Sequence, residues 1–393
     1  MSTYAAVMTG KGTGAISTTQ VFGDKAEIVL KKIFRQAGTK PAKFRTGEIL
    51  LGQITNGNET IDQVTIGCET AHSLAINCHG NPLIVADIMQ LLGRHGVKLL
   101  TVEELLAKIL SAQKSTNTIA LEAKLAQLKA KTIEGAKIIA NQIDGGLSKI
   151  ATDWLQNINR IPLSKIKNCA KRILETSQAA KLIIYGCKAA IAGPPNTGKS
   201  TLLNCLCGRQ KAIVTDIKGT TRDWVSARCQ IGSLSVELID TAGLNEKLAA
   251  ESDTLDKESQ MRAVRILEDA DLVLLVLDNS QIAEQLDGKL LEKIADKKIL
   301  AVLNKSDLTT RFNADRLPKI LTDTVKISAK LETGIVELTE KIRQLCGAAD
   351  FNLHTTVCIT SRQENLLRQL KKVKSKKQAA SIITELLNGQ LSV

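Results

Sequence analysis

The hydrophobic positions of the chain change their spacing several times, and each change marks a different kind of structure. From about Lys188 to Gly347, short apolar runs alternate with helix-length amphipathic segments. The runs are "CKAAIAG", "SLSVELID", "ADLVLLVLD", "KILAVLNK" and "TVKISA". This alternation is typical of a doubly wound, mostly parallel sheet covered by helices. The sequence therefore predicts a multidomain α/β chain, with the doubly wound domain at residues 186–347.

Helical spacing flanks this region on both sides. Residues 121–182 carry apolar side chains at helical intervals, and "SRQENLLRQLKKVKSKKQAASIITELL" follows the α/β region. We expect one helical domain, built from residues 117–185 and a truncated second part at 348–393, into which the α/β domain is inserted. Residues 1–116 mix strand-like pieces such as "EILLGQIT" with helical ones, which predicts a separate α+β domain.

Composition narrows the class of protein. Hydrophobic residues make up 44% of the 393 positions and aromatic residues only 2%, so we expect cores of Leu, Ile, Val and Ala. No apolar run approaches the roughly 20 residues of a membrane span, and the N-terminus lacks a signal-peptide pattern. The nine cysteines show neither metal-ligand nor framework spacing, which predicts a cytoplasmic, reduced protein. The net charge of +13 suits a polyanionic partner such as RNA but does not require one.

The segment "GPPNTGKST", which follows the first α/β strand, has the spacing of a phosphate-binding loop. Its backbone N–H groups and the start of the next helix are expected to bind phosphates. Lys199 would act on the phosphate charge during catalysis, and the Ser200 hydroxyl would bind Mg2+. The other residues of the predicted phosphate-binding site are Gly193, Asn196, Thr197, Gly198 and Thr201.

Two later motifs follow in the order expected of a nucleotide hydrolase. "ELIDTAG" puts Asp240 at a strand end, where it can hold Mg2+ through water, and brings Gly243 toward the γ-phosphate. "DIKGTTRD" supplies Thr221, which we expect to reach Mg2+ when the γ-phosphate is present. The chain is therefore predicted to bind a nucleoside triphosphate together with Mg2+.

The motif "LNKSD" predicts the base. Asp307 can accept two hydrogen bonds from the N1–H and the exocyclic amine of guanine, a donor pair that adenine lacks. The rest of the predicted pocket is Asn304 and Lys305 beside the ring, with Ser328, Ala329 and Lys330 offering a backbone N–H to the guanine oxygen. The sequence thus predicts a GTPase that binds GTP and GDP.

The run "GPPNTGKSTLLNCLCGRQKAIVTDIKGTTRD", followed by "IDTAGL", resembles the MnmE (TrmE) family of tRNA-modification GTPases. "GKGTGAISTTQVFGDKAEIVLKKIF" and "ETAHSLAINCHGNPLIVADIMQLL" resemble the N-terminal domain of that family, so the resemblance covers the chain in outline. It implies an N-terminal domain that dimerises and binds a tetrahydrofolate derivative, and GTPase domains that dimerise across their nucleotides. It also implies tRNA as a substrate and an FAD-dependent MnmG-type partner.

The resemblance further implies a K+ ion in the position of an arginine finger. Asn196 would be its side-chain ligand, and the loop from Thr215 to Gly219, including Ile217, would enclose it. Two alternatives stay open. Asn196 caps its own loop through side-chain to backbone hydrogen bonds, or the Lys218 ammonium takes the place of the ion.

Water activation departs from the pattern of small GTPases. Leu244 follows "DTAG" where a glutamine would orient the attacking water, and no arginine finger is evident. Aligned with the family's switch segment, "SDTLDKESQMRA" puts Asp256 where a water-orienting glutamate is expected, with Glu258 as a rival. For both carboxylates, a solvated loop charge is an equally good interpretation.

A second departure concerns tRNA modification. The family's C-I-G-K motif, whose cysteine the modification needs, is absent from "ITELLNGQLSV". We therefore expect GTP hydrolysis without restored modification of the wobble uridine. The alternative from another class is a nucleotide-gated RNA- or partner-binding GTPase. A third possibility, a ribosome-assembly GTPase, draws on the basic run "LKKVKSKKQ", which also suits a solvated helix face.

Overall fold

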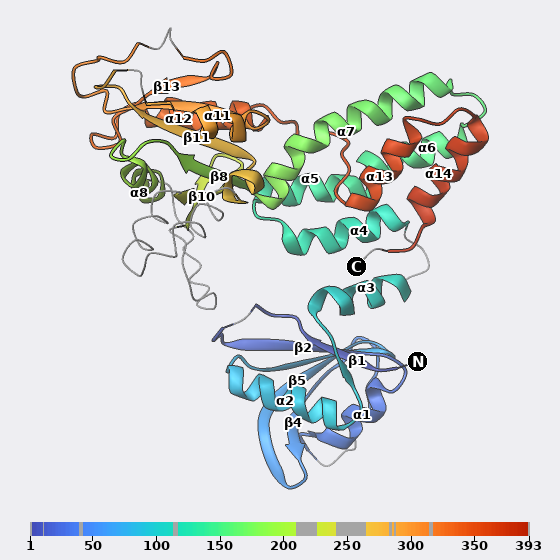
Figure 1. Cartoon of the computed structure of the whole chain (residues 1–393). Helices are drawn as coiled ribbons and strands as arrows, with labels where there is room; N and C mark the ends of the chain where they lie inside the picture. Colours follow the sequence, from blue (N-terminus) through green and yellow to red (C-terminus); the bar gives the residue numbers. More distant parts are fainter. Residues whose placement is uncertain are drawn as a thin grey trace. The chain divides into compact units, whose positions relative to one another are not determined.

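The structure is a computed structural model, and it describes residues 2–10, 12–38, 42–112, 117–209, 226–240, 265–282, 285–286, 288–313 and 317–391 (Figure 1). The chain divides into two compact units, the first comprising residues 1–121 and 390–393 and the second comprising Glu122–Gly389. Among the described helices, none combines the length and the apolar character that crossing a membrane requires.

The first unit is built on a largely antiparallel sheet of order β3-β4-β5-β6-β2-β1-β7. Its strands are β1 (Tyr4–Val7), β2 (Ile16–Phe22), β3 (Phe34–Gln36), β4 (Ile49–Asn56), β5 (Glu59–Thr70), β6 (Ser73–His79) and β7 (Lys98–Leu99), and its helices are α1 (Ala26–Ile33), α2 (Pro82–Arg94) and α3 (Val102–Ala112). Buried and exposed residues alternate along β4 because apolar side chains cover one face of the sheet. Leu30 of α1 and Leu92 of α2 are fully buried in that core.

Asn81 begins helix α2 as its N-cap residue. Its side-chain oxygen accepts a hydrogen bond from Leu83 N at 2.9 Å, and Pro82 occupies the first helical position. Both features favour the start of a helix at this position.

The second unit contains the predicted doubly wound domain, with a sheet of order β13-β12-β11-β8-β10-β9. Its elements are β8 (Cys187–Ala192), α8 (Lys199–Arg209), β9 (Ser226–Ile231), β10 (Leu234–Asp240), β11 (Leu272–Asp278), α11 (Gly288–Ile294), β12 (Lys298–Asn304), β13 (Thr324–Lys326) and α12 (Ile335–Leu345). The strands β8, β10, β11, β12 and β13 pair in parallel, which confirms the mostly parallel sheet. Among the described strands of this sheet, only β9, which the sequence did not predict, pairs antiparallel, at the edge beside β10.

The remaining helices come from both flanks of the sheet, as expected from the sequence, and α4 begins four residues before the second unit does. They are α4 (Thr118–Ala126), a 3-10 turn η1 (Gln127–Lys129), α5 (Ile133–Asp144), α6 (Gly146–Gln156), α7 (Leu163–Tyr185), α13 (Ser361–Leu370) and α14 (Lys376–Asn388). Figure 1 shows α5, α6, α7, α13 and α14 gathered beside one another. Ile138 of α5 and Ile183 of α7 share one apolar core with Ala189 and Val236 of the sheet, so the helices and the sheet are packed together.

The two places where the chain passes between helices and sheet lie next to each other. Helix α7 ends at Gly186, whose φ of 89° favours glycine, and β8 begins at the next residue. The chain leaves the sheet domain through Cys346, the C-cap of α12. The Sγ atoms of Cys187 and Cys346 are 3.8 Å apart in the core. An inserted domain needs its ends close together, and this pair of thiols marks where they meet.

A buried ion pair holds the two sequence-distant parts of the helical region together. The Glu122 carboxylate of α4 accepts hydrogen bonds from Arg362 Nε at 2.7 Å and Nη2 at 2.9 Å. It also accepts from Gln363 Nε2 at 2.7 Å and Thr360 Oγ1 at 3.2 Å. Arg362 in turn donates to the backbone oxygens of Glu385 and Leu386 in α14. One carboxylate therefore joins α4, α13 and α14.

We expect Glu122→Gln to lower the free energy of unfolding of the helical region by about 3 kcal/mol, since it leaves the Arg362 charge buried without its partner. Urea unfolding followed by the fluorescence of Trp154, buried in α6, measures this in a Trp224→Phe background. The control is Glu175→Gln, where an exposed carboxylate lies 3.8 Å from Lys171 and the expected change is below about 0.5 kcal/mol. Equal unfolding midpoints for the two variants would contradict the role assigned to Glu122.

Candidate functional site

The predicted phosphate loop lies between β8 and α8, and its shape depends on two glycines. Gly193 has a φ of 135°, and a Cβ there would lie 2.2 Å from Val276 O. Gly198 has a φ of 92°, and a Cβ there would lie 2.3 Å from Asn304 Nδ2. Both positions therefore exclude a side chain by conformation and by space. The loop is closed by a hydrogen bond from Thr197 Oγ1 to Pro194 O at 3.0 Å.

Lys199 lies within this loop. Its side chain is buried, and its Nζ donates to Gly193 O at 3.0 Å and to Pro194 O at 2.6 Å. These carbonyls hold the ammonium at the start of α8, where the backbone N–H groups of a helix N-terminus also gather. The positive groups that a triphosphate requires are therefore assembled in one place.

Two of the predicted Mg2+ ligands are in direct contact. Ser200 Oγ, on the first turn of α8, donates to Asp240 Oδ2 at 2.6 Å. Asp240 ends β10, which pairs in parallel with β8, and its side chain is buried. A hydroxyl and a carboxylate at this separation form an oxygen donor set suited to Mg2+. Thr201, the next residue of α8, is exposed.

Asn304 joins the phosphate loop to the base-binding segment. It ends β12, and its Nδ2 donates to Thr197 O at 2.8 Å. Its Oδ1 accepts from Ala329 N at 3.0 Å. With both ends of its amide engaged and its side chain buried, Asn304 fixes the distance between the residues predicted for phosphate and those predicted for guanine.

Lys305 is held by an aspartate that the sequence analysis missed. Its Nζ donates to Asp278 Oδ2 at 2.7 Å, and Asp278 ends β11, the strand beside β12. Burial raises the pKa of the Asp278 carboxyl, but hydrogen bonds from Lys305 and Ser280 outweigh it, and the pKa falls below its ordinary value. Asp278 therefore stays ionised and orients Lys305. Its position at the end of the apolar run "LVLLVLD" was the signal available in the sequence.

Asp307, the predicted base-selecting residue, is exposed and ionised. A hydrogen bond from Ser328, in the predicted guanine segment, is the main cause that holds the pKa of its carboxyl below the ordinary value. Ser328 is fully buried, Ala329 is buried and Lys330 is exposed. The structure thus brings "LNKSD" and the 328–330 segment together and leaves the Asp307 carboxylate open to a ligand.

Asn196 has an unusual backbone at the tip of the phosphate loop. Its φ is 61°, in the left-handed region, and its side chain is exposed. Within the part of the chain that the structure describes, the Asn196 amide makes no hydrogen bond, although the neighbouring Thr197 hydroxyl does. The predicted site residues Thr215, Ile217, Thr221, Gly243, Asp256 and Glu258, together with Lys218 and Leu244, lie outside the described residues.

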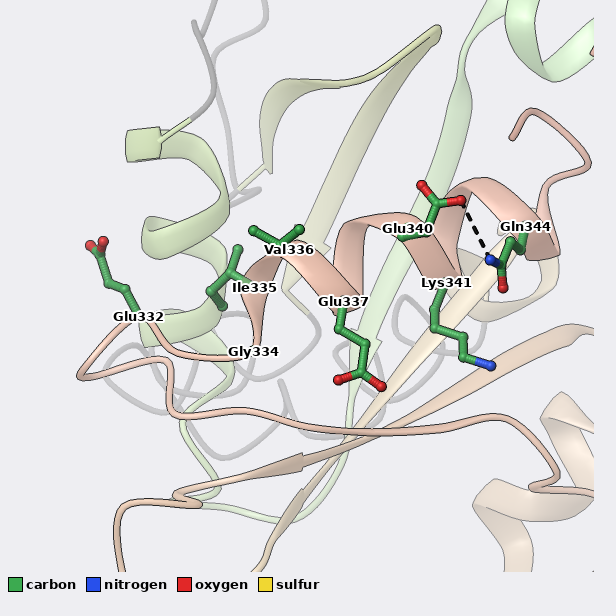
Figure 2. Close-up of a pocket in the computed structure, with 8 residues that line it drawn as sticks. All are labelled: Glu332, Gly334, Ile335, Val336, Glu337, Glu340, Lys341 and Gln344. Atoms are coloured by element: carbon green, nitrogen blue, oxygen red, sulfur yellow. Dashed lines mark hydrogen bonds between the residues drawn. The ribbon is translucent and has the colours of Figure 1, made fainter. Parts of the chain in front are cut away.

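The pocket in Figure 2 is separate from these motifs. It has a volume of about 530 Å³ and is lined by Glu332, Gly334, Ile335, Val336, Glu337, Glu340, Lys341 and Gln344. All of these side chains come from α12 or the turn before it, and none belongs to the nucleotide motifs (Figure 2). In the described ranges, no three His, Cys, Asp or Glu side chains gather into a metal-binding group.

Comparisons with known proteins relate this chain to GTPases. Residues 188–305 match a family described as 50S ribosome-binding GTPase. The tRNA modification GTPase MnmE of Ligilactobacillus salivarius is 31% identical over 405 residues, covering 93% of this chain and 86% of the relative. The MnmE of Lactobacillus helveticus is 32% identical, covering 94% and 87%. Among solved structures, the G domain of T. maritima FeoB is 30% identical over 40% of this chain and 98% of its own, with a TM-score of 0.31.

We expect Asp307→Asn to change base preference from guanine to xanthine nucleotides, because the amide donates to the exocyclic oxygen that xanthine carries in place of the guanine amine. Competition of GDP and xanthosine diphosphate against a fluorescent guanine nucleotide measures the ratio, which should move by at least about tenfold. Asp296→Asn, an exposed aspartate of the same domain, is the control. Equal affinities of the unmutated protein for ATP and GTP would refute this account of base recognition.

Proposed function

The chain belongs to the MnmE family of tRNA modification GTPases, and from this premise we propose that it hydrolyses GTP with the help of K+, in a dimer of GTPase domains. The enzyme is a GTPase, and it binds GTP or GDP with Mg2+. The proposal concerns what supplies the positive charge that an arginine finger would bring. Asn196 and the segment Thr215–Gly219, with Thr215 and Ile217, would hold the ion.

The free amide of Asn196 is the observation that carries this proposal. If Asn196 only capped its own loop, its side chain would bond to nearby backbone groups, yet within the described residues it makes no hydrogen bond. Asparagine is one of the few residue types that adopts a left-handed backbone readily. The exposed side chain of Asn196, on the loop predicted to bind the phosphates, therefore remains available to a cation.

The distribution of cations supports the same proposal. Lys199 lies in the phosphate loop, whereas the Lys305 ammonium is bound to Asp278 at 2.7 Å. Phosphoryl transfer places negative charge on the β- and γ-phosphate oxygens, and enzymes usually stabilise it with more than one positive group beside Mg2+. A K+ ion between Asn196 and the phosphates would supply the second charge. Asp256 or Glu258 would orient the attacking water.

For partners, we propose tRNA, a second copy of this chain and an FAD-dependent MnmG-type protein, in the cytoplasm. The named relatives are tRNA modification GTPases. We propose four domain segments, with boundaries at 1–116, 117–185, 186–347 and 348–393. A tetrahydrofolate derivative would bind in the first of them.

The second candidate function is nucleotide-gated binding of RNA or a partner without modification. It is favoured by the cysteines, because none of the nine is exposed, whereas a reactive thiolate needs access.

GTP turnover should be at least tenfold faster in K+ than in Na+ at equal ionic strength, because backbone carbonyls and Asn196 set the size of the cation cage. Asn196→Ala should remove most of this difference while leaving GDP affinity within about threefold, since Asn196 would act on charge that develops in the transition state. Asn204→Ala, an exposed asparagine of α8, should keep the K+ dependence. Phosphate release under single-turnover conditions measures hydrolysis by all three proteins, and competition of GDP against a fluorescent guanine nucleotide measures the affinity for GDP.

Two outcomes would count against the K+ proposal. Equal rates in K+ and Na+ that fall in Lys218→Ala would indicate that the Lys218 ammonium takes the cation position. Unchanged K+ dependence in Asn196→Ala would mean that Asn196 is not a ligand.

We expect this chain, produced in a strain that lacks its own MnmE but keeps the FAD partner, to hydrolyse GTP without restoring the wobble-uridine modification. Burial raises the pKa of the Cys358 thiol, and it also raises the pKa values of the Cys68 and Cys78 thiols. Because the thiolate is the reactive form, these cysteines are suited to packing in the core and not to a reaction. Mass spectrometry of tRNA nucleosides measures the outcome. Restoration to normal levels would assign the modification to this chain and reject the second candidate.

A further inference from the structure

The positive charge of the chain is concentrated in its helical region. Residues 186–347, which form the GTPase domain, contain 23 Lys and Arg and 23 Asp and Glu, so this part is neutral. The helical segments 122–185 and 348–393 contain 18 Lys and Arg against 8 Asp and Glu. Those segments therefore account for +10 of the net +13, and the general basicity of the protein has a specific location.

Two stretches of the helical region contain no acidic residue at all. Residues 154–174 carry five basic side chains and residues 365–384 carry six. We call these eleven residues the basic tip: Arg160, Lys165, Lys167, Lys171, Arg172, Arg368, Lys371, Lys372, Lys374, Lys376 and Lys377. A solvated helix face normally mixes both signs of charge, so an unbroken positive set needs another explanation.

The fold brings the two stretches together although about 200 residues separate them in sequence. Lys167 Nζ, in the first turns of α7, donates to Val373 O between α13 and α14 at 3.3 Å. Lys376 Nζ, at the start of α14, donates to Asn159 O before α7 at 2.7 Å. Figure 1 shows α7, α13 and α14 in the same group of helices. The stretches thus form one surface, fixed by reciprocal hydrogen bonds.

The cations of this surface are free to meet a partner. Arg160, Lys165, Lys371, Lys372, Lys374 and Lys377 are exposed, and within the described residues none of these six forms an ion pair. The ion pairs at the edges of the basic tip are Lys171 with Glu175 and Arg368 with Glu364. Like charges this close repel one another, and a polyanion would relieve that repulsion.

We propose that the basic tip binds the phosphate backbone of RNA. The site is independent of the nucleotide motifs, and only the choice of tRNA as the RNA rests on the proposed function. Two observations favour RNA over an anionic membrane. The large apolar side chains that the structure exposes include none from residues 154–174 or 365–384, whereas a helix that binds at a membrane surface inserts such side chains. The charge is also arranged over two segments, which suits a backbone with many phosphates.

The composition of the basic tip also indicates whether it would recognise the RNA sequence or only the phosphate backbone. Trp154 is the one aromatic residue in the two stretches, and it is buried in the core. Specific recognition of single-stranded RNA commonly stacks bases on exposed aromatic side chains. Lysines that contact phosphates position a nucleic acid without reading its sequence. The basic tip therefore contributes affinity and placement.

The test compares two quadruple variants with equal changes in net charge. The first replaces exposed residues of the basic tip, Lys371→Gln, Lys372→Gln, Lys374→Gln and Lys377→Gln. The control replaces exposed lysines of the GTPase domain, Lys293→Gln, Lys298→Gln, Lys319→Gln and Lys326→Gln. Binding of an unmodified tRNA transcript to the full chain is measured at several salt concentrations, with GTP hydrolysis in the absence of RNA as the check on folding.

We expect the tip variant to bind the transcript at least about tenfold more weakly, and the control variant to bind within about twofold of the unmutated protein. The slope of log affinity against log salt should fall by roughly 0.7 to 0.9 for each lost phosphate contact in the tip variant alone. GTP hydrolysis should be unchanged in both variants, which separates this proposal from the one for the catalytic site.

Three results would overturn the proposal. An equal loss of affinity in both variants would mean that net charge alone matters, and no loss in the tip variant would place RNA elsewhere. Binding to phosphatidylglycerol vesicles that the tip variant loses, with RNA binding retained, would assign the surface to a membrane.

Discussion

One amide group sets the geometry on which the nucleotide site depends. Asn304 Nδ2 donates to Thr197 O in the phosphate loop at 2.8 Å. Its Oδ1 accepts from Ala329 N, in the predicted guanine segment, at 3.0 Å. Because Gly198 has no side chain, the Asn304 amide can lie against the loop, and a Cβ at that glycine would lie 2.3 Å from Asn304 Nδ2. The parallel strands bring Asp240, Asp278 and Asn304 to the same edge of the sheet. The residues predicted to bind phosphate, metal and base therefore lie along one edge of the sheet.

The sequence predicts this part well because its chemistry is local. The spacing of Gly193, Gly198, Lys199 and Ser200 specifies a strand, a turn and a helix within a few residues, and the structure has all three. The apolar runs likewise predict the buried strands, since β11 is buried along its whole length. The edge strand β9 was missed because its sequence, "SARCQI", has few buried positions. For edge strands and polar turns, the pattern of neighbouring residues is too weak to predict the secondary structure.

Features that depend on tertiary contacts could not be predicted from the sequence. Asp278 orients Lys305 from the neighbouring strand; the end of the run "LVLLVLD" marks Asp278 in the sequence, but only the pairing of β11 with β12 brings it to Lys305. Residues 154–174 and 365–384 look separately like ordinary basic helices, and only packing makes them one surface. The same holds for Glu122 and Arg362, which are distant in sequence and form a buried ion pair. The helical region is therefore held together by contacts between residues that are distant in sequence. It also carries most of the net positive charge, whereas the GTPase domain attached to it is neutral.

The central claim is that Asn196 positions a monovalent cation against the phosphates, and its most direct test is crystallographic. The GTPase, bound to GDP, Mg2+ and aluminium fluoride, would be crystallised with Rb+ replacing K+, and anomalous diffraction would locate the heavier ion. The account predicts an anomalous peak beside Asn196 Oδ1 and the phosphate oxygens, absent in Asn196→Ala. No peak at that position, or density for the Lys218 ammonium there, would contradict it.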